Sequence, residues 1–281
     1  MRILITGANG KLAASLQAFF SNTEHDFIGL GRSQLDITDR IQVLAMMLDL
    51  QPDVVIHTAA LTKVDYCAEH PDEALEINAY GTRNVALACQ AIDTTLLYIS
   101  TNEVFDGTNT GAYLEYDDTH AINPYGYSKL VGEGIVRDLV RRHYIVRTSW
   151  VYAHGGRNFI HAILDRAQAS QSLRVVVNEV STPTYADDLA VGVGRLVQTG
   201  AYGIYHLVNE GRASRWEFAR HVLDVAGYSD TPIERISSHE YPRASTPPEY
   251  SVLRNFAAAR LGITLRPWRE AVADFCRKEG L

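Results

Sequence analysis

The chain opens with Arg2-Ile3-Leu4-Ile5-Thr6-Gly7-Ala8-Asn9-Gly10-Lys11-Leu12-Ala13, and this stretch decides the fold. Its first residues are typical of a buried strand, and the segment that follows places apolar residues on one helical face: Leu12, Leu16, Phe19 and Phe20. The glycines between them permit a tight turn and let backbone N–H groups approach a pyrophosphate at the positive end of the helix. A plain turn would also explain two glycines, but this position between strand and helix favours a dinucleotide site.

The end of the second apolar run distinguishes NAD from NADP. An acidic residue there would bind the ribose hydroxyls, whereas an arginine accommodates a 2′-phosphate. The sequence has Gly31-Arg32-Ser33 and no acid. Arg32 offers a planar fork to phosphate and Ser33 a hydroxyl donor, although an exposed loop arginine is the alternative. With the glycine turn upstream, the pattern favours NADPH, bound by Gly7, Asn9, Gly10, Lys11, Leu12, Arg32 and Ser33.

Further apolar runs alternate with amphipathic segments through the first half of the chain. Strands are predicted at 2–6, 26–30, 54–58, 96–100 and 144–147, and Pro71 opens a helical stretch that ends near Ala91. Such alternation indicates a parallel sheet covered by helices on both faces. The right-handed crossover rule then predicts an α/β, Rossmann-type doubly wound fold.

The pattern changes after about Trp150. Strands are sparse there (174–177 and 204–208), and loops rich in Pro, Ser and Thr occur near 181–184 and 242–248. A capping box at Ser214–Glu217 begins one helix, and a last helix is predicted to begin at Pro267. We expect an NADP-binding Rossmann domain over 1–150, with 181–208 packing back on it. Residues 151–281 should form a smaller C-terminal mixed α/β substrate lobe that covers the carboxyl ends of the strands.

Tyr125-Gly126-Tyr127-Ser128-Lys129 places a tyrosine and a lysine one helical turn apart on one face. A free tyrosine has a pKa of about 10, too high for easy proton transfer at neutral pH. A nearby ammonium favours the phenolate and moves that pKa toward the working range. Ser100-Thr101, at the end of a predicted strand, could steady a carbonyl oxygen beside the tyrosine. These residues predict an acid–base site.

Composition narrows the class of protein further. The 281 residues are 46% hydrophobic and 21% charged, with a net charge of −7, which argues against a nucleic-acid partner. Cys67, Cys89 and Cys276 form no disulfide or zinc pattern, so we expect buried, reduced thiols. With no signal-peptide layout and no long apolar run, we expect a soluble cytoplasmic protein without a membrane partner. A monomer and a homodimer are both open.

The three motifs together, Thr6-Gly7-x-x-Gly10, Ser100-Thr101 and Tyr125-x-x-x-Lys129, resemble those of the extended short-chain dehydrogenase/reductases. More narrowly, nearly the whole chain resembles the dTDP-4-dehydrorhamnose reductase family. The residues that carry this resemblance are Leu35-Asp36-Ile37-Thr38-Asp39, His57-Thr58-Ala59-Ala60-Leu61-Thr62-Lys63-Val64-Asp65, Ile77-Asn78-Ala79, Tyr98-Ile99-Ser100-Thr101, Val104-Phe105-Asp106-Gly107, Asn123-Pro124-Tyr125-Gly126, Arg147-Thr148-Ser149-Trp150-Val151-Tyr152 and Pro183-Thr184.

The resemblance implies reduction of the 4-keto group of a nucleotide-linked deoxysugar, in which dTDP-4-dehydro-L-rhamnose becomes dTDP-L-rhamnose. Tyr125 would donate a proton to the sugar O4 while C4 receives hydride from NADPH. Lys129 would bind the nicotinamide ribose and tune Tyr125, and Thr101 would hold the keto oxygen. The resemblance also places Asp36 and Ile37 beside the adenine, Ala60, Leu61 and Thr62 along the cofactor, and Trp150 against the sugar nucleotide. A core position is the alternative for Trp150.

One motif departs from the family pattern. The reductases have Ser-Thr-Asp-Tyr where this chain has Ser100-Thr101-Asn102-Glu103, with Asn102 and Glu103 expected to face the substrate. The pair resembles the Asp-Glu of nucleotide-sugar 4,6-dehydratases, but Asn102 cannot donate a proton as a carboxylic acid would. A 4,6-dehydratase, a 4-epimerase and a non-catalytic NADP-binding subunit resembling the methionine adenosyltransferase β subunit therefore stay open as alternatives.

The substrate diphosphate requires cations from the second lobe, and five arginines are candidates, with Arg243 the preferred one: Arg157, Arg174, Arg215, Arg243 and Arg254. Some family members bind magnesium through acidic residues, one of them in the first helix. The corresponding residue here is Ser15, so the resemblance predicts no metal.

Overall fold

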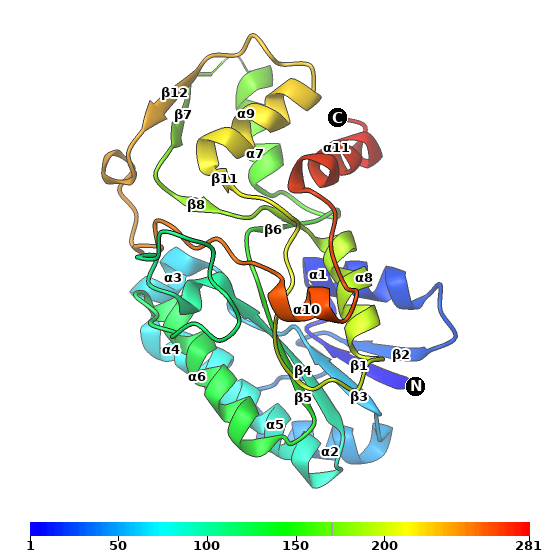
Figure 1. Ribbon diagram of the computed structural model, residues 1–281. Helices are drawn as coiled ribbons and strands as arrows, with labels where there is room; N and C mark the ends of the chain where they lie inside the picture. The colour runs from blue at the N-terminus through cyan, green and yellow to red at the C-terminus, as the bar shows by residue number, and fades with distance from the viewer. Residues whose placement is uncertain (170) are drawn as a thin grey trace.

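The computed structural model describes residues 1–169 and 171–281. The lobe that lies lower in Figure 1 is built on a six-stranded parallel sheet with the order β10-β5-β4-β3-β1-β2. Its strands are β1 (Arg2–Thr6), β2 (Asp26–Leu30), β3 (Val54–His57), β4 (Thr95–Thr101), β5 (His143–Thr148) and β10 (Gly203–His206). The Rossmann-type doubly wound sheet is confirmed, and its sixth strand returns from the second half of the chain.

Helices cover both faces of this sheet because successive strand residues point to opposite sides. Ile3 and Ile5 of β1 belong to the apolar cluster formed with α1 (Lys11–Phe20) and α8 (Ala186–Leu196). Leu4 belongs to the cluster on the other face, which includes Met47, Val85 and Val136. These three residues come from α2 (Arg40–Leu50), α5 (Thr82–Ala91) and α6 (Pro124–Leu139). The short helix α10 (Phe256–Arg260) packs beside β10, and α3 spans Val64–Glu69.

The helical stretch predicted from Pro71 to Ala91 is confirmed, and a π-turn lies within it. The segment consists of α4 (Pro71–Leu75), the π-helical η1 (Glu76–Gly81) and α5. Within η1 the buried Asn78 accepts from the Leu61 backbone N–H at 2.7 Å and donates to the Ser128 hydroxyl at 2.9 Å. Such turns are common at functional sites. Here one ties the loop after β3 to the helix that carries Tyr125 and Lys129.

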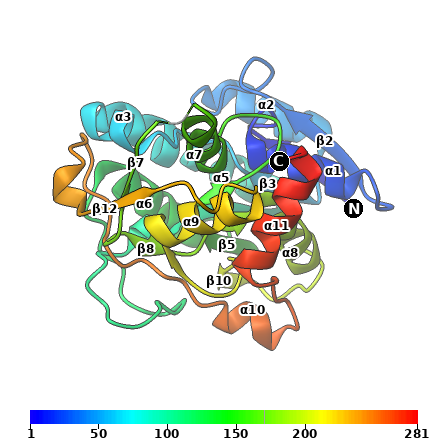
Figure 2. The same ribbon diagram turned by 90° about the horizontal axis from the view of Figure 1, so that it is seen from above.

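The second lobe is smaller and mixed, and Figures 1 and 2 show it above the carboxyl ends of the sheet. Tyr152, Phe218, Trp268 and Phe275 form its aromatic core. The capping box between Ser214 and Glu217 is confirmed. The elements here are β6 (Val151–Tyr152), α7 (Phe159–Gln168), β7 (Leu173–Val176), β8 (Val180–Ser181), β9 (Thr184–Tyr185), β11 (Ala213–Ser214), α9 (Arg215–Val225), β12 (Ile233–Ile236), η3 (Ser238–Glu240) and α11 (Trp268–Glu279).

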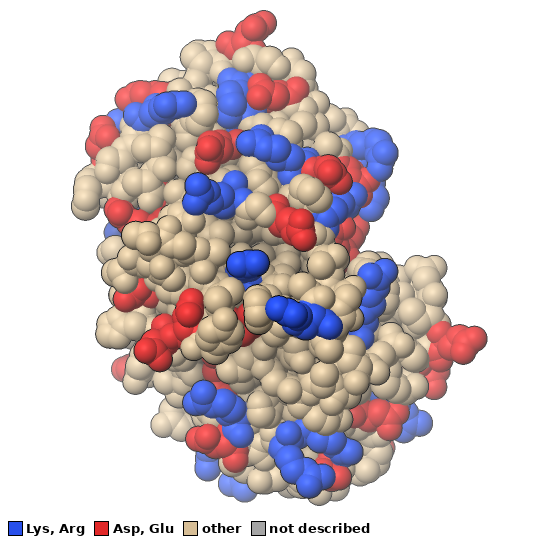
Figure 3. Space-filling view, in the orientation of Figure 1, with Lys and Arg blue, Asp and Glu red and all other residues tan. Residues whose placement is uncertain are grey.

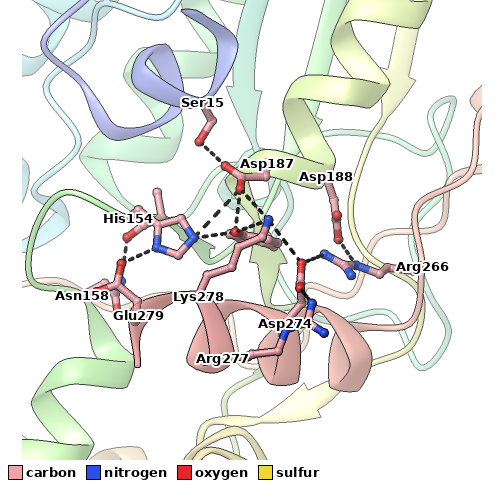
Figure 4. Close-up of polar contacts among 12 residues, drawn as sticks. Ser15, His154, Asn158, Asp187, Asp188, Arg266, Asp274, Arg277, Lys278 and Glu279 are labelled. Atoms are coloured by element: carbon pink, nitrogen blue, oxygen red, sulfur yellow. Dashed lines mark hydrogen bonds and ion pairs between the residues drawn. The ribbon is translucent and has the colours of Figure 1, made fainter. Parts of the chain in front are cut away.

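A charged network fastens α11 to the sheet-covering helices (Figure 4). Asp187, at the start of α8, accepts a hydrogen bond from Ser15 of α1 at 2.8 Å and pairs with Lys278 of α11 at 3.3 Å. Arg266 joins Asp188 and Asp274, each at 2.8 Å. The network thus connects the two lobes through α1, α8 and α11.

The three cysteines are unpaired and buried, as predicted. Burial raises the pKa of the Cys67 thiol to about 11 and so keeps it protonated near neutral pH. Among the residues that the structure describes, no helix has both the length and the apolar character that a bilayer crossing requires.

Candidate active site

A cavity of about 820 Å³ lies between the lobes. Its floor is formed by residues at the carboxyl ends of β1, β3, β4 and β5, and its roof includes Trp150, Phe159, Arg215 and Phe218. The sheet order reverses between β1 and β3, and in open α/β sheets ligands bind outside the strand ends at such a reversal. The fold therefore places the cavity where the sequence predicts the cofactor.

The glycine turn between β1 and α1 fits a phosphate group. Gly7 has φ +67°, and a Cβ there would lie 2.7 Å from the Ala59 Cα, so the close approach of the two loops requires glycine. Gly10 caps α1 without any side-chain acceptor, and the first turn of the helix contains no acid. The positive helix end is left available to an anion. Five predicted residues of this turn line the cavity: Gly7, Asn9, Gly10, Lys11 and Leu12.

Arg32 also lines the cavity, and 79% of its side chain is exposed. Its guanidinium lies 3.6 Å from the Asp36 carboxylate, whose pKa is lowered chiefly by the Thr38 backbone N–H. Ser33 is exposed and lies outside the lining, so the structure does not bring it to the site. The other residues predicted along the cofactor do line the cavity: Asp36, Ile37, Ala60, Leu61 and Thr62.

We expect Arg32 to select the cofactor. In an Arg32→Gln variant, kcat/KM for NADPH should fall by about 10- to 100-fold, because a charge-assisted contact to the 2′-phosphate is worth roughly 1.5–3 kcal/mol. The value for NADH, which lacks that phosphate, should change little. Initial rates with both cofactors provide the measurement, and an equal loss for the two would contradict this role.

Tyr125 and Lys129 both line the cavity from the first turns of α6. Asn123 caps that helix by accepting from the Gly126 N–H at 2.8 Å. Burial, followed by the nearby Glu103 charge, raises the pKa of Tyr125 well above its ordinary range, while the Thr101 hydroxyl lowers it. The sequence predicted a pKa lowered by lysine, but loss of hydration is the larger effect. A tyrosine that keeps its proton suits the role of an acid.

Lys129 lies on the Tyr98 ring, with its Nζ 4.0 Å from the ring centroid. Burial lowers the pKa of Lys129 to about 7, and the Glu133 carboxylate opposes the shift. Glu133 itself receives Arg147 Nη2 at 2.7 Å, Arg147 Nε at 2.9 Å and the Ser100 hydroxyl at 2.5 Å, all buried. This ion pair could not be predicted from sequence, because Glu133 lies on α6 and Arg147 on β5 and their spacing does not indicate a contact.

The pKa of Lys129 sets an expected pH dependence. The side chain is an ammonium below about pH 7 and neutral above it. Only the ammonium stabilises the phenolate that proton donation leaves on Tyr125, so kcat/KM for NADPH oxidation should fall as the pH rises through about 7. A Lys129→Arg variant keeps its charge and should lose this fall. A wild-type rate that rises across the same range would contradict the assignment.

The motif Ser100-Thr101-Asn102-Glu103, which differs from the family pattern, faces the cavity as predicted from sequence. Asn102 and Glu103 both line it beside Thr101. The Asn102 amide donates to the Ser251 hydroxyl at 2.7 Å, and the Glu103 Oε2 accepts from the Asn123 amide at 2.7 Å. Asn123 does not itself line the cavity but holds Glu103 there. Sequence reasoning missed this contact, although the Asn-Pro pair at a helix start signals a capping role.

Trp150 lines the cavity with a left-handed backbone, φ +42°, which is uncommon for a bulky residue. The Arg215 guanidinium stacks 3.5 Å from its ring centroid and is held by the buried Glu179 at 3.4 Å. Arg243 pairs with Asp65 at 3.4 Å and with Glu179 at 3.5 Å. Of the five candidate cations only Arg215 lines the cavity, so the structure does not bring Arg157, Arg174, Arg243 and Arg254 to it.

On the face of the molecule that Figure 3 shows, basic and acidic side chains are interspersed. On the roof of the cavity, among the lining residues named above, the positive charge comes from Arg215. A doubly wound sheet, a glycine turn at its switch point and a Thr–Tyr–Lys set under a second lobe define an extended short-chain dehydrogenase/reductase.

Comparison with known proteins narrows the class. A family model described as the RmlD substrate binding domain matches residues 1–280. The chain is 37% identical to the spore coat polysaccharide biosynthesis protein SpsK of Bacillus subtilis, covering 99% of this chain and 97% of that protein. It is 38% identical to a dTDP-4-dehydrorhamnose reductase of Mycolicibacterium smegmatis, covering 97% of this chain and 84% of that protein.

Two solved structures are similar over the full length. A dTDP-4-dehydrorhamnose reductase from Clostridium acetobutylicum superimposes with a TM-score of 0.96 at 34% identity and covers 100% of both chains. The enzyme of the same name from Bacillus anthracis, in complex with NADP, gives 0.95 at 36% identity over 99% of each chain. The chain belongs to the dTDP-4-dehydrorhamnose reductase family of the extended short-chain dehydrogenase/reductases.

Proposed function

We propose that the protein reduces the 4-keto group of a nucleotide-linked deoxysugar with NADPH, converting dTDP-4-dehydro-L-rhamnose to dTDP-L-rhamnose. The observation that carries the proposal is the half-buried Tyr125, whose raised pKa keeps it protonated, beside Lys129 and Thr101 in one cavity. The names of the relatives and the NADP complex of the Bacillus anthracis enzyme support the substrate and the cofactor.

Each residue of the site has its own role in the proposed reaction. NADPH, when bound, supplies the hydride that C4 receives. Gly7, Gly10 and the amino-terminal N–H groups of α1 hold its pyrophosphate, and Arg32 holds its 2′-phosphate. Thr101 positions the keto oxygen, and Tyr125 donates its proton to that oxygen as negative charge develops there. Lys129 then stabilises the phenolate left behind.

Trp150 and Arg215 form the surface that receives the sugar nucleotide. A guanidinium stacked on an aromatic ring and fixed by Glu179 is preorganised to bind an anion, so Arg215 binds the diphosphate. Arg243, the cation preferred from sequence, acts through Glu179 and the loop 242–248. We also propose that residues 1–150 with 181–208 bind the cofactor, that 151–281 bind the sugar nucleotide, and that the cytoplasm is the site of the reaction.

Paired variants test the assignment of the cation. Arg215→Gln should raise KM for the sugar nucleotide about tenfold or more, because a charged hydrogen bond contributes roughly 1.5–3 kcal/mol. Arg243→Gln should raise it less, since that side chain lies outside the cavity lining. Steady-state kinetics at saturating NADPH measure both, and a larger effect in Arg243→Gln would reverse the assignment.

A direct assay tests the proposed function. Purified protein is mixed with NADPH and freshly generated dTDP-4-dehydro-L-rhamnose, and NADPH absorbance is followed. Rapid oxidation with formation of dTDP-L-rhamnose supports the proposal. A folded protein that binds NADPH but leaves the ketone unreduced would instead point to the non-catalytic subunit, and water elimination from a 4-hydroxy sugar nucleotide would point to the dehydratase.

A further inference from the structure

Glu103 presents a carboxylate to the same cavity, close enough to Tyr125 for its charge to raise the pKa of that tyrosine. Glu103 belongs to the short helix η2 (Asn102–Val104), which follows β4 directly. A Cβ at Gly126 would lie 2.0 Å from the Glu103 carbonyl oxygen, so this turn is pressed against the first turn of α6. The glycine that follows Tyr125 therefore allows the backbone of Glu103 to reach this close to the acid of the reaction.

The carboxylate is held at one oxygen and open at the other. Asn123 donates to Oε2 at 2.7 Å, while Oε1 has no hydrogen-bond partner in the described part of the chain. Burial raises the pKa of Glu103, and the Arg243 and Arg215 charges oppose that shift while Glu179 adds to it. A carboxylate with little hydration and a raised pKa is a stronger base than one in water.

We propose that Glu103 gives this site a second activity, the removal and return of a proton on a carbon next to the C4 carbonyl of the bound 4-keto sugar. The inference rests on the proposed function, because it requires the same ketone in the same cavity. Removal of a proton from C3 or C5 of such a sugar requires neither an oxidant nor a metal. The carbonyl alone makes these hydrogens acidic, since the charge is delocalised onto oxygen.

The step balances within the site. A C–H bond at C3 or C5 breaks, and its proton passes to Oε1 of Glu103. The electron pair of that bond forms a carbon–carbon double bond to C4, and the displaced carbonyl pair on O4 accepts the Tyr125 proton to give an enol. The reverse steps return a proton to the carbon and restore the ketone. Where the proton on Glu103 exchanges with solvent, the sugar acquires solvent hydrogen.

Deuterium exchange tests the proposal. The protein is incubated with dTDP-4-dehydro-L-rhamnose and NADP⁺, which cannot donate hydride, in buffered D₂O, and deuterium at C3 and C5 is followed by mass spectrometry and NMR. We expect incorporation faster than in a sample without protein. Glu103→Gln should slow the protein-dependent exchange by about 100-fold or more, the usual contribution of a positioned base. NADPH oxidation by the same preparation should fall by a smaller factor.

Matched variants keep the test decisive. Glu210→Gln removes an exposed carboxylate and should leave exchange unchanged, and thermal melts confirm that each variant is folded. Exchange at the rate of the protein-free sample, or an equal rate in wild type and Glu103→Gln, would overturn the proposal. NADPH oxidation without exchange leaves the reductase assignment standing and removes only the role of Glu103. Glu103-dependent exchange without NADPH oxidation would keep the role of Glu103 and remove the reductase assignment.

Discussion

Replacing Tyr125 by phenylalanine is expected to lower kcat for NADPH oxidation by about 10³-fold, within the range that a positioned acid contributes. The reason is local: the half-buried phenol has a raised pKa, keeps its proton and lines the cavity beside Thr101, where we propose that the keto oxygen binds. The loss of one oxygen atom leaves the ring packing intact, so NADPH binding should persist. Stopped-flow oxidation and NADPH fluorescence titration measure the two quantities.

Tyr127 offers the matched control. It lies on the same helix two residues away, but its side chain is 52% exposed and outside the cavity lining. Tyr127→Phe should keep kcat within about twofold, in line with surface substitutions elsewhere. If Tyr125→Phe retained more than about a tenth of the wild-type rate, another group would have to be the acid, since a positioned acid contributes at least 10²-fold.

Replacing Arg147 by methionine is expected to destabilise the protein by about 3–5 kcal/mol, the usual cost of stranding one member of a buried ion pair. Arg147 and Glu133 are each 3% exposed and joined by two hydrogen bonds. Among the residues that the structure describes, the variant leaves the core carboxylate of Glu133 with the Ser100 hydroxyl as its remaining hydrogen-bond donor and with the Lys129 charge nearby. Urea denaturation of wild type and variant gives the difference in unfolding free energy.

Two further variants serve as controls for the loss of unfolding free energy in Arg147→Met. Arg174→Met breaks an ion pair whose members are about half exposed, and should cost at most about 1 kcal/mol. A double variant, Arg147→Met with Glu133→Leu, should recover much of the loss, because neither member of the Arg147–Glu133 pair is then left without the other. A single variant that loses less than about 1 kcal/mol would show that water reaches Glu133 and that the pair is not a buried one.

The sheet and the cofactor turn could be predicted from sequence because both depend on local patterns. Apolar runs of strand length separated by amphipathic segments specify the parallel sheet, and Gly7 is needed where its φ of +67° and its contact with Ala59 exclude other residues. The doubly wound arrangement followed from the crossover rule. The π-turn at Glu76–Gly81 could not be predicted from sequence, because it depends on Asn78 reaching Leu61 and Ser128 across the fold.

The site residues also differ in whether the sequence could predict them. Tyr125 and Lys129 are one turn apart on a helix, so their spacing alone placed them together. Which arginine of the second lobe faces the cavity could not be read from composition, since Arg215 is brought there by the capping box that begins α9 and by stacking on Trp150. The support behind Lys129, from Tyr98 and Glu133, likewise depends on packing between elements.

The most direct test of the central claim follows the hydride itself. NADPH carrying deuterium at its transferable position is incubated in ordinary water with dTDP-4-dehydro-L-rhamnose and the protein, and the product is examined by NMR. The account predicts dTDP-L-rhamnose with one deuterium at C4, formed by wild type and almost absent with Tyr125→Phe. Deuterium at another carbon, or a product formed equally well by that variant, would contradict it.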